Sequence, residues 1–292
     1  MLDERRIGDA QRDRRKPVRN DLELLRAVTT RRNAVGRIPE SRTTQGRSRP
    51  MSGSLYCMPS EPPLSAAHLF DALGVDYERA YGHMPERDIA LEWLGARLPS
   101  GAHVLDVGSG TGVPAARALA DKGYRVVGID VSPVMVDIAR RQVPDATFLQ
   151  TDVLDYDTEP GSLDAACVFF SLLQIPRAQI DATVHRIADW LRPGGYLVLA
   201  AVPADIDGLT IDFLGHPIRV SSYTVPAYLD LLRAAGMDIL ETRESTWIPE
   251  GGGDPEDILF VYCHKPAGYR SPPASDHDAM PETPAVGATT IE

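Results

Sequence analysis

The stretch Val104-Leu-Asp-Val-Gly-Ser-Gly-Thr-Gly112 decides the fold and marks the first candidate binding site. A short apolar run ends at Asp106, and glycines then occupy every second position from 108 to 112, before an Ala/Leu-rich segment. This order predicts a strand, a tight loop and a helix. Because glycine accepts positive φ angles and has no Cβ, such a loop lets a ligand lie against the backbone at the start of a helix.

Two more acidic residues stand where the following strands are expected to end. Asp130 closes the segment 124–130, and Asp152 follows the segment 146–150. A carboxylate at the tip of the second strand of a doubly wound sheet can accept hydrogen bonds from two ribose hydroxyls. Acids at three successive strand ends therefore predict an adenosine site, with the amino-acid end of the ligand near the glycine loop.

A nicotinamide dinucleotide site is the alternative interpretation of the glycine loop. That fingerprint prefers Gly-x-Gly-x-x-Gly, whereas here the third glycine falls one residue early and Asp106 lies two residues before the first. An acid at this position repels a diphosphate but attracts a ligand that ends in an ammonium group. The pattern therefore favours a zwitterionic ligand.

Strands and helices alternate along the middle of the chain. The expected strands cover about 103–107, 125–130, 146–150, 164–170 and 196–201. Helices are expected at 65–81, interrupted at Gly74, and at 85–98, and the chain continues with a hairpin in 202–222, a helix at 226–235 and strands at 238–248 and 257–263. Such alternation predicts right-handed crossovers and a parallel sheet, which is a doubly wound α/β fold.

The net charge of −11 conceals two unlike parts. Residues 1–50 carry 14 Lys+Arg against 7 Asp+Glu, a charge of +7, so the remainder carries −11 − 7 = −18. An acidic body repels nucleic-acid phosphates, so no nucleic-acid partner is expected. The Arg-rich segment 1–62 predicts a disordered extension, with a nucleic-acid-binding arm as the alternative, and residues 268–292 predict a disordered tail.

Composition excludes several other classes of protein. No apolar run approaches the ~20 residues of a membrane-spanning helix, so no membrane contact is expected. The three cysteines, Cys57, Cys167 and Cys263, are widely spaced and form no metal-ligand pattern. We therefore predict a cytoplasmic protein with free thiols and without a metal site, as a monomer or homodimer.

Taken together, the motifs resemble those of the class I S-adenosylmethionine-dependent methyltransferases. The stretch 104–112 is similar to the first motif of that family, 128–133 to its ribose-binding acidic loop, 151–153 to its adenine-contacting segment, 163–173 to its fourth strand, and 191–199 to its fifth helix, turn and strand. The resemblance covers roughly residues 65–265. It implies a Rossmann-like domain over 63–267, a mostly parallel seven-stranded sheet with an antiparallel last strand, and 202–222 as a substrate-lid hairpin.

The resemblance also implies S-adenosyl-L-methionine as cofactor and assigns residues to it. Asp106 would anchor the methionine ammonium group, Asp130 would accept from both ribose hydroxyls, and Asp152 would accept from the adenine amino group. The other expected contacts are backbone approach at Gly108, Gly110 and Gly112, the adenine neighbours Val131 and Met135, the Val153 backbone, and the Phe169 carbonyl.

Residues for the methyl acceptor are predicted from their place between the motifs. Tyr77 and Tyr81 are expected to close over the cofactor, and Tyr81 is also a catalytic candidate. His216, at the turn of the hairpin, and His83 are candidate bases, because histidine titrates near neutral pH. Phe170, Phe213 and Trp247, with Phe169, are expected to wall an apolar pocket. The alternatives are core aromatic residues and exposed loop histidines.

We therefore predict a methyltransferase that acts on O, N or C of a small molecule in specialised metabolism. Val168-Phe-Phe-Ser stands where family members that methylate nucleic-acid or glutamine amino groups carry Asn/Asp-Pro-Pro-aromatic. Leu173 and Gln174 replace the paired histidines of some small-molecule members. Three alternatives stay open: a non-methylating reaction such as cyclisation on the same scaffold, a nucleic-acid-associated enzyme using the Arg-rich head, and a cofactor-binding regulator without turnover.

Overall fold

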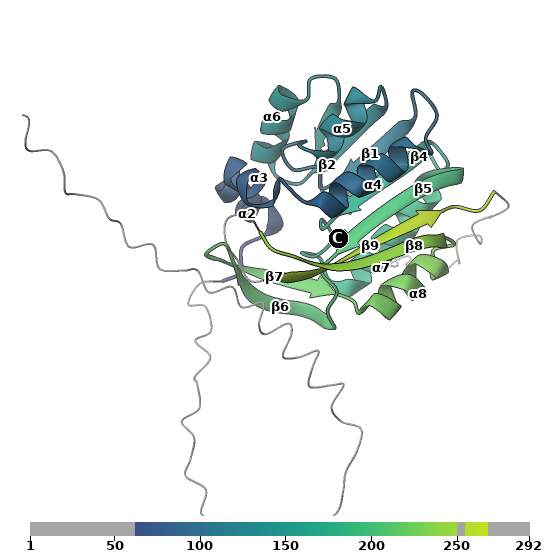
Figure 1. Cartoon of the computed structure of the whole chain (residues 1–292). Helices are drawn as coiled ribbons and strands as arrows, with labels where there is room; N and C mark the ends of the chain where they lie inside the picture. Colours follow the sequence, from purple (N-terminus) through teal and green to yellow (C-terminus); the bar gives the residue numbers. More distant parts are fainter. Residues whose placement is uncertain (1–61, 250–254, 268–292) are drawn as a thin grey trace, which may run out of the picture.

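The computed structural model describes residues 62–249 and 255–267 (Figure 1). The expected terminal segments, apart from residue 62, and Cys57 lie outside these residues. Within the two described ranges, every helix falls short of the length and apolarity needed to cross a bilayer.

Helices and strands follow one another close to the expected positions. The helices are α2 (Ala66–Leu73), α3 (Val75–Tyr81), α4 (Pro85–Gly95), α5 (Ala115–Asp121), α6 (Pro133–Gln142), α7 (Arg177–Trp190) and α8 (Val225–Ala234). The strands are β1 (His103–Val107), β2 (Arg125–Asp130), β3 (Thr147–Gln150), β4 (Leu163–Phe169), β5 (Leu191–Ala201), β6 (Ile206–Phe213), β7 (His216–Ser222), β8 (Asp238–Trp247) and β9 (Glu256–His264). The fifth strand begins before the expected residue 196, because Leu191 already pairs with Leu163 ahead of a bulge.

The main sheet has seven strands in the order β3-β2-β1-β4-β5-β9-β8. Strands β1 to β5 pair in parallel, whereas β9 runs antiparallel to both of its neighbours. This topology confirms the prediction of a doubly wound, mostly parallel sheet with an antiparallel last strand. The order reverses between β1 and β4, and in open α/β sheets ligands bind beyond the carboxyl ends of the strands at such a point.

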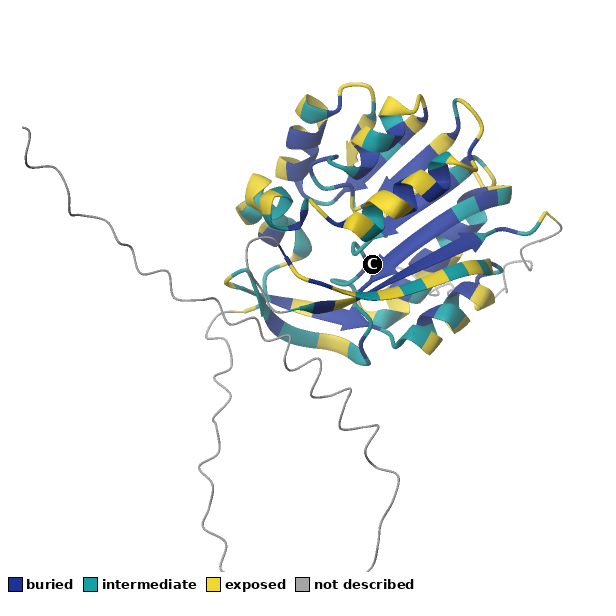
Figure 2. Cartoon of the chain, viewed as in Figure 1, coloured by how far each residue is buried: buried dark blue, intermediate teal, exposed yellow. Residues whose placement is uncertain are grey.

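Two apolar cores lie on opposite faces of the sheet. Neighbouring residues of one strand point to opposite faces, so Val104 packs under α4, α5 and α6, whereas Leu105 packs against α7 and α8. Figure 2 shows the central strands buried and the outer sides of the helices exposed. Helices thus cover both faces of the sheet, so a binding site has to lie at the ends of its strands.

A separate small layer covers the carboxyl ends of the parallel strands. The hairpin β6–β7 is a two-stranded sheet of its own, and its Ile218 and Val220 pack with Leu69 of α2 in a third apolar cluster. Leu64 forms a parallel bridge with Ile218. Helix α2 is also tied to α6, because the Ser132 hydroxyl donates to Asp71 at 2.6 Å. The expected hairpin is therefore present and packed against the first helix (Figure 1).

Candidate cofactor and acceptor site

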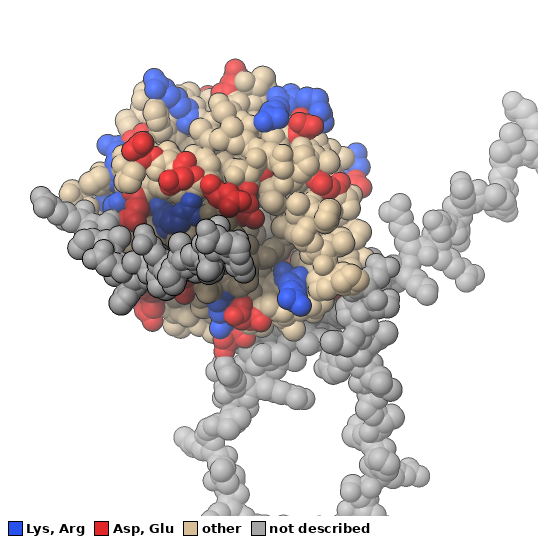
Figure 3. Space-filling view, turned by 180° about the vertical axis from the view of Figure 1, so that it is seen from behind, with Lys and Arg blue, Asp and Glu red and all other residues tan. Residues whose placement is uncertain are grey.

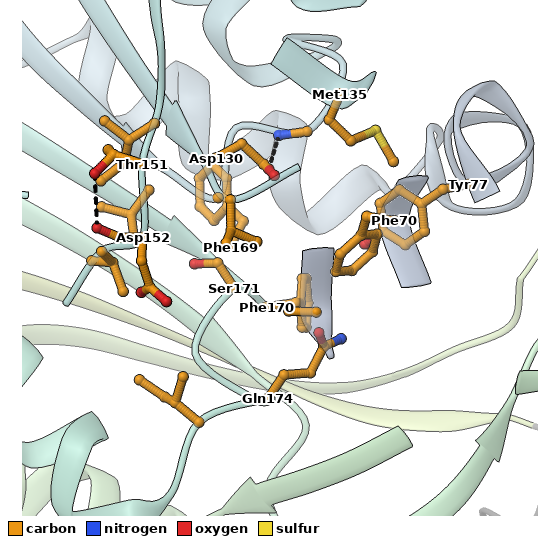
Figure 4. A pocket seen from close by; sticks show the side chains of 18 residues that line it. Phe70, Tyr77, Asp130, Met135, Thr151, Asp152, Phe169, Phe170, Ser171 and Gln174 are labelled. Atoms are coloured by element: carbon orange, nitrogen blue, oxygen red, sulfur yellow. Dashed lines mark hydrogen bonds between the residues drawn. The ribbon is translucent and has the colours of Figure 1, made fainter. Parts of the chain in front are cut away.

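A cleft of about 760 Å³ opens beyond the carboxyl ends of β1, β2 and β4. It brings together most of the residues predicted to contact a cofactor: Gly108, Gly110, Asp130, Val131, Met135, Asp152, Val153 and Phe169. Figure 4 shows the cleft with Asp130, Met135 and Asp152 among its lining side chains. Tyr77 and Phe170, predicted for the acceptor side, also line it.

Backbone hydrogen bonds hold the glycine loop against the end of β2. The amides of Gly108 and Ser109 donate to the Ile129 carbonyl at 2.8 and 3.0 Å. Gly108 has a φ of 68°, and a Cβ on it would lie 2.3 Å from the Cβ of Ser171. Only glycine allows this approach between the loop and the segment after β4.

Gly112 has a different surrounding from the other two loop glycines. It lines none of the described hollows, and a Cβ on it would lie 2.9 Å from the Phe148 ring and 3.3 Å from Ala139. The geometry therefore does not support the predicted contact between Gly112 and the cofactor. The absence of a side chain here serves the packing of the loop against α6 and β3.

Asp130 is buried and holds two backbone amides. Its Oδ1 accepts from Ser132 at 2.9 Å and its Oδ2 accepts from Gly110 at 2.8 Å. Burial raises the pKa of this carboxyl, while these backbone donors act in the opposite direction. The backbone of Val131 acts on this carboxylate as well, and the side chain lines the cleft, where a ribose hydroxyl would donate to it.

Asp106 lies deeper, at a second hollow of about 470 Å³ that the glycine loop also lines. Its side chain is buried, and among the described residues its Oδ2 has no hydrogen-bond partner. Burial raises the pKa of Asp106 to about 7, although the charge of Arg87 lowers it. A buried acceptor without a partner indicates that a ligand supplies the donor.

Arg87 was not identified in the sequence, although it lies beside this acid. It comes from α4, and its Nη2 donates to the carbonyls of Tyr81 and Gly82 at 3.0 and 2.5 Å. Its Nε is buried without a partner among the described residues. Asp106 and Arg87 therefore each keep an unused hydrogen-bonding atom beside the glycine loop. They fit the ammonium and carboxylate groups at the amino-acid end of a ligand.

A third hollow of about 820 Å³ lies between α2–α3 and the hairpin. Its wall is mostly apolar and includes Ile211, Phe213, Ile218 and Val220 of β6–β7. The cofactor cleft shares with it the wall residues Phe70, Tyr77, Phe170 and Gln174. We call this third hollow the acceptor cavity, because it adjoins the cleft at these shared side chains.

Phe170 stands between the two hollows in an unusual backbone conformation. Its φ is 60°, in the left-handed region that a bulky residue rarely adopts. The surrounding contacts hold it there: its amide donates to Ala200 at 2.9 Å, and its ring meets Phe260 edge-on, with the ring centroids 5.8 Å apart. Conformations of this kind cluster at functional sites.

The predicted aromatic residues form a packed row. Tyr77 stacks on Tyr81 with 5.2 Å between ring centroids, and Tyr81 packs on Phe213 and Trp247. Tyr77 lines all three hollows and Phe213 lines the acceptor cavity. Trp247, expected in the pocket wall, lies behind Tyr81 and lines none of these hollows.

The structure does not bring the candidate histidines into the site. His83 is exposed, and His216 is half-buried at the start of β7, paired with Phe213 beside the hairpin turn. Neither lines the cleft, the hollow at Asp106 or the acceptor cavity. Their catalytic assignment therefore finds no support in the geometry.

Glu256, which the sequence did not single out, is the buried acid nearest the candidate Tyr81. The Tyr81 hydroxyl donates to its Oε1 at 3.3 Å. Burial raises the pKa of Glu256 to about 7, and burial together with the Glu256 charge raises the pKa of Tyr81. The tyrosine hydroxyl therefore remains protonated and acts as a donor.

Comparison with known proteins places methyltransferases among the relatives of this chain. A family model described as a methyltransferase domain matches residues 104–195. A demethylmenaquinone methyltransferase of Beutenbergia cavernae is 36% identical over 130 residues, which are 44% of this chain and 50% of that protein. The chain thus spans about half the length of the first curated relatives that it matches.

Two further proteins extend the comparison. The dTDP-3-amino-3,6-dideoxy-alpha-D-glucopyranose N,N-dimethyltransferase of Streptomyces fradiae is 35% identical over 173 residues, which are 54% of this chain and 67% of that protein. The crystal structure of the [4+2]-cyclase SpnF shares the fold, with a TM-score of 0.53 and 20% identity over 71% of this chain and 99% of that one.

The fold and the cleft define a Rossmann-like domain with a hollow at the switch point of its sheet. The chain belongs to the class I S-adenosylmethionine-dependent methyltransferases, and S-adenosyl-L-methionine is its cofactor.

Proposed function

We propose that this protein transfers a methyl group from S-adenosylmethionine to a small, largely apolar molecule held in the acceptor cavity. One observation carries this proposal: the cofactor cleft and the acceptor cavity meet at Tyr77 and Phe170. A cofactor in the cleft and an acceptor in the cavity would therefore approach each other at this shared wall.

The cleft and the hollow at Asp106 would together hold the cofactor along its whole length. Asp152 and Val153 would hold the adenine ring, and Asp130 would hold the ribose. Asp106 and Arg87 would hold the ammonium and carboxylate groups at the other end. The support is chemical, since the unpartnered Oδ2 of Asp106 complements an ammonium and the unpartnered Nε of Arg87 complements a carboxylate.

When bound, the cofactor supplies an electrophilic methyl group on a sulfonium, and its thioether is the leaving group. The protein therefore has to orient the two reactants and to exclude water from them. Tyr77 and Phe170 would fix the angle between the two ligands, and the hairpin would cover them. Alignment of two reactants can contribute about 7–11 kcal/mol to lowering a barrier.

The distribution of charge on the surface also supports a small-molecule acceptor. On the face shown in Figure 3, Lys and Arg side chains form separate groups with Asp and Glu near them, so this face offers no continuous basic stripe for a phosphate backbone. The relatives' names include the methylation of a demethylmenaquinone and of a nucleotide amino sugar. Both are small molecules, which supports the proposed class.

The test is binding of S-adenosylhomocysteine by calorimetry, followed by incubation with S-adenosylmethionine and a library of small molecules. We expect saturable binding, and a product heavier by one methyl group together with S-adenosylhomocysteine. A rearranged product of unchanged mass would favour the non-methylating alternative, and a failure to bind S-adenosylhomocysteine would refute the proposal.

A further inference from the structure

Glu256 is the only carboxylate among the described residues that line the acceptor cavity. It is the first residue of β9, and its side chain is 8% exposed. Most of the cavity wall around it is aromatic or aliphatic, from α2–α3, the segment after β4, and the hairpin. A carboxylate in such a wall is costly unless something compensates its charge.

Among the described residues, the Glu256 carboxylate has a hydrogen bond but no ion pair. Its partner is the Tyr81 hydroxyl at 3.3 Å, and within residues 62–249 and 255–267 no lysine or arginine forms an ion pair with it. Arg87 of α4 lines the same cavity, but its Nη2 is bound to the carbonyls of Tyr81 and Gly82. Among the described residues no cation is paired with the Glu256 carboxylate, so a ligand can supply one.

The charge of that ligand follows from electrostatics. An ammonium group gains both a hydrogen bond and an ion pair with a buried carboxylate. A phenolate or a carboxylate placed beside it meets a like charge in a poorly solvated wall. A neutral hydroxyl group gains a hydrogen bond only.

We propose that Glu256 is a catalytic residue that binds the ammonium form of an amine acceptor, takes one proton from it and thereby makes this protein an N-methyltransferase. The inference rests on the proposed function and narrows its acceptor to primary and secondary amines. Tyr81 is then a positioning residue, because its hydroxyl orients the carboxylate.

The chemistry balances with groups already named. The ammonium nitrogen gives one proton to the Glu256 carboxylate, which becomes a carboxylic acid, and the nitrogen recovers its lone pair. That lone pair forms the new N–C bond to the methyl group while the C–S bond breaks and its electron pair stays on sulfur. The methylated nitrogen is then cationic, and Glu256 releases its proton to solvent when the product leaves.

Matched pairs of amines and alcohols test the inference without any substitution. The protein saturated with S-adenosylhomocysteine would be titrated with benzylamine and benzyl alcohol, and with cyclohexylamine and cyclohexanol. We expect each amine to bind about tenfold or more tightly than its alcohol, since a charged hydrogen bond is retained only with the amine. Equal binding within each pair, or binding of neither partner, would overturn the proposal.

A variant pair assigns the preference to this residue. Glu256→Gln keeps the shape of the side chain and an oxygen for Tyr81, and it should remove most of the amine preference while S-adenosylhomocysteine binds as before. Asp257→Asn is the matched control, because Asp257 is the next residue, exposed, and bound to the Thr246 hydroxyl outside the cavity. An unchanged amine preference in Glu256→Gln, with cofactor affinity retained, would refute the assignment.

The pH dependence gives a second readout. Among the described residues that line the cavity, the titratable and charged groups besides Glu256 are Tyr77 and Tyr81 of α3 and Arg87 of α4, and the lining residues from the hairpin are apolar residues and serines. Burial raises the pKa of Glu256 to about 7, so amine affinity should fall as pH is lowered through this value. Glu256→Gln should flatten the fall, and Asp257→Asn should keep it.

Failure of this inference and failure of the proposed function are distinguishable. A protein that binds S-adenosylhomocysteine and methylates a hydroxyl or carbon acceptor, with no preference for amines, keeps the proposed function and loses the role of Glu256. A protein that binds no S-adenosylhomocysteine loses both.

Discussion

The amide of Gly110 donates a 2.8 Å hydrogen bond to Oδ2 of Asp130, which joins the glycine loop after β1 to the end of β2 (Figure 4). The same carboxylate accepts from Ser132 at the start of α6. Asp130 therefore has two roles: it faces the cleft where a ribose would lie, and it holds the loop on which the rest of the cofactor would rest.

Removal of the Asp130 side chain should therefore weaken cofactor binding by more than the loss of one ligand contact. We expect Asp130→Ala to reduce S-adenosylhomocysteine affinity about tenfold or more, since one hydrogen bond to a charged group contributes about 1.5–3 kcal/mol. Calorimetry measures the loss. Asp137→Asn is the control, because Asp137 forms an exposed ion pair with Arg140 on the same helix α6. Equal affinity of Asp130→Ala and wild type would contradict the assignment.

Cofactor binding should release protons near neutral pH through Asp106. Burial raises the pKa of this carboxyl to about 7 in the ligand-free protein, so it is partly protonated there. An ammonium group beside it favours the carboxylate and lowers its pKa, so affinity should rise with pH through this range. Calorimetric titrations in buffers of different ionisation enthalpy would measure the protons released. Asp106→Asn should remove the release, and a wild-type titration without any release would refute the prediction.

The same two raised acids should affect folding stability. The pKa values of Asp106 and Glu256 are both raised by burial to about 7, well above their unfolded values. Such groups contribute stability that is fully present below the unfolded pKa and is lost as pH rises through the folded pKa. The double variant Asp106→Asn/Glu256→Gln should therefore gain melting temperature relative to wild type at about pH 8 and much less at about pH 5. Thermal unfolding without ligand tests this, and a pH-independent difference would contradict it.

The close approach at Gly108 should be intolerant of any side chain. Gly108→Ala adds a Cβ that would lie 2.3 Å from the Ser171 Cβ, at a φ of 68°. Gly123→Ala is the matched control, with a φ of 79° and no atom within 4 Å. The control should cost about 1–2 kcal/mol of unfolding free energy for backbone strain alone. Gly108→Ala should cost more and weaken S-adenosylhomocysteine binding, whereas equal losses would show that the approach is not rigid.

Much of the cofactor site was predictable because its residues lie within short, ordered motifs. Asp106, Asp130 and Asp152 each close a strand, and the parallel pairing of β1, β2 and β3 brings those ends together. Arg87 and Glu256 were not predictable in this way. One lies on a helix before the first strand and the other opens the last strand, so only the packing of α3 and α4 over β8–β9 brings them to the cavity.

The acceptor side was also misjudged where an apolar or titratable residue was taken for a ligand contact. Trp247 packs behind Tyr81, and the hairpin turn carries His216 away from the described hollows. Residue type indicates what a side chain is able to do. Its direction depends on strand register, and for β6–β7 and β8–β9 that register is set by pairings and bulges that leave no local signal.

Arg177, the first residue of α7, holds the base of the hairpin. Loss of the Arg177 side chain should therefore loosen the acceptor cavity and leave the cofactor cleft unchanged. Its Nε and Nη2 donate to the Ser222 carbonyl at 2.9 and 2.6 Å, and Nη2 also donates to Asp205 at 2.8 Å. Ser222 lines the acceptor cavity, whereas none of these residues lines the cofactor cleft.

We expect Arg177→Met to speed hydrogen exchange of the β6–β7 amides about tenfold, because hydrogen bonds to a charged group contribute about 1.5–3 kcal/mol. Arg177→Lys should rescue this only in part, since lysine lacks the planar fork that reaches two acceptors. Amine affinity should fall and S-adenosylhomocysteine affinity should stay. Arg233→Met, which breaks only an exposed ion pair with Asp230, is the control. If the hairpin amides of Arg177→Met stay as protected as those of this control, the hairpin is held by its contact with Leu69 of α2 instead.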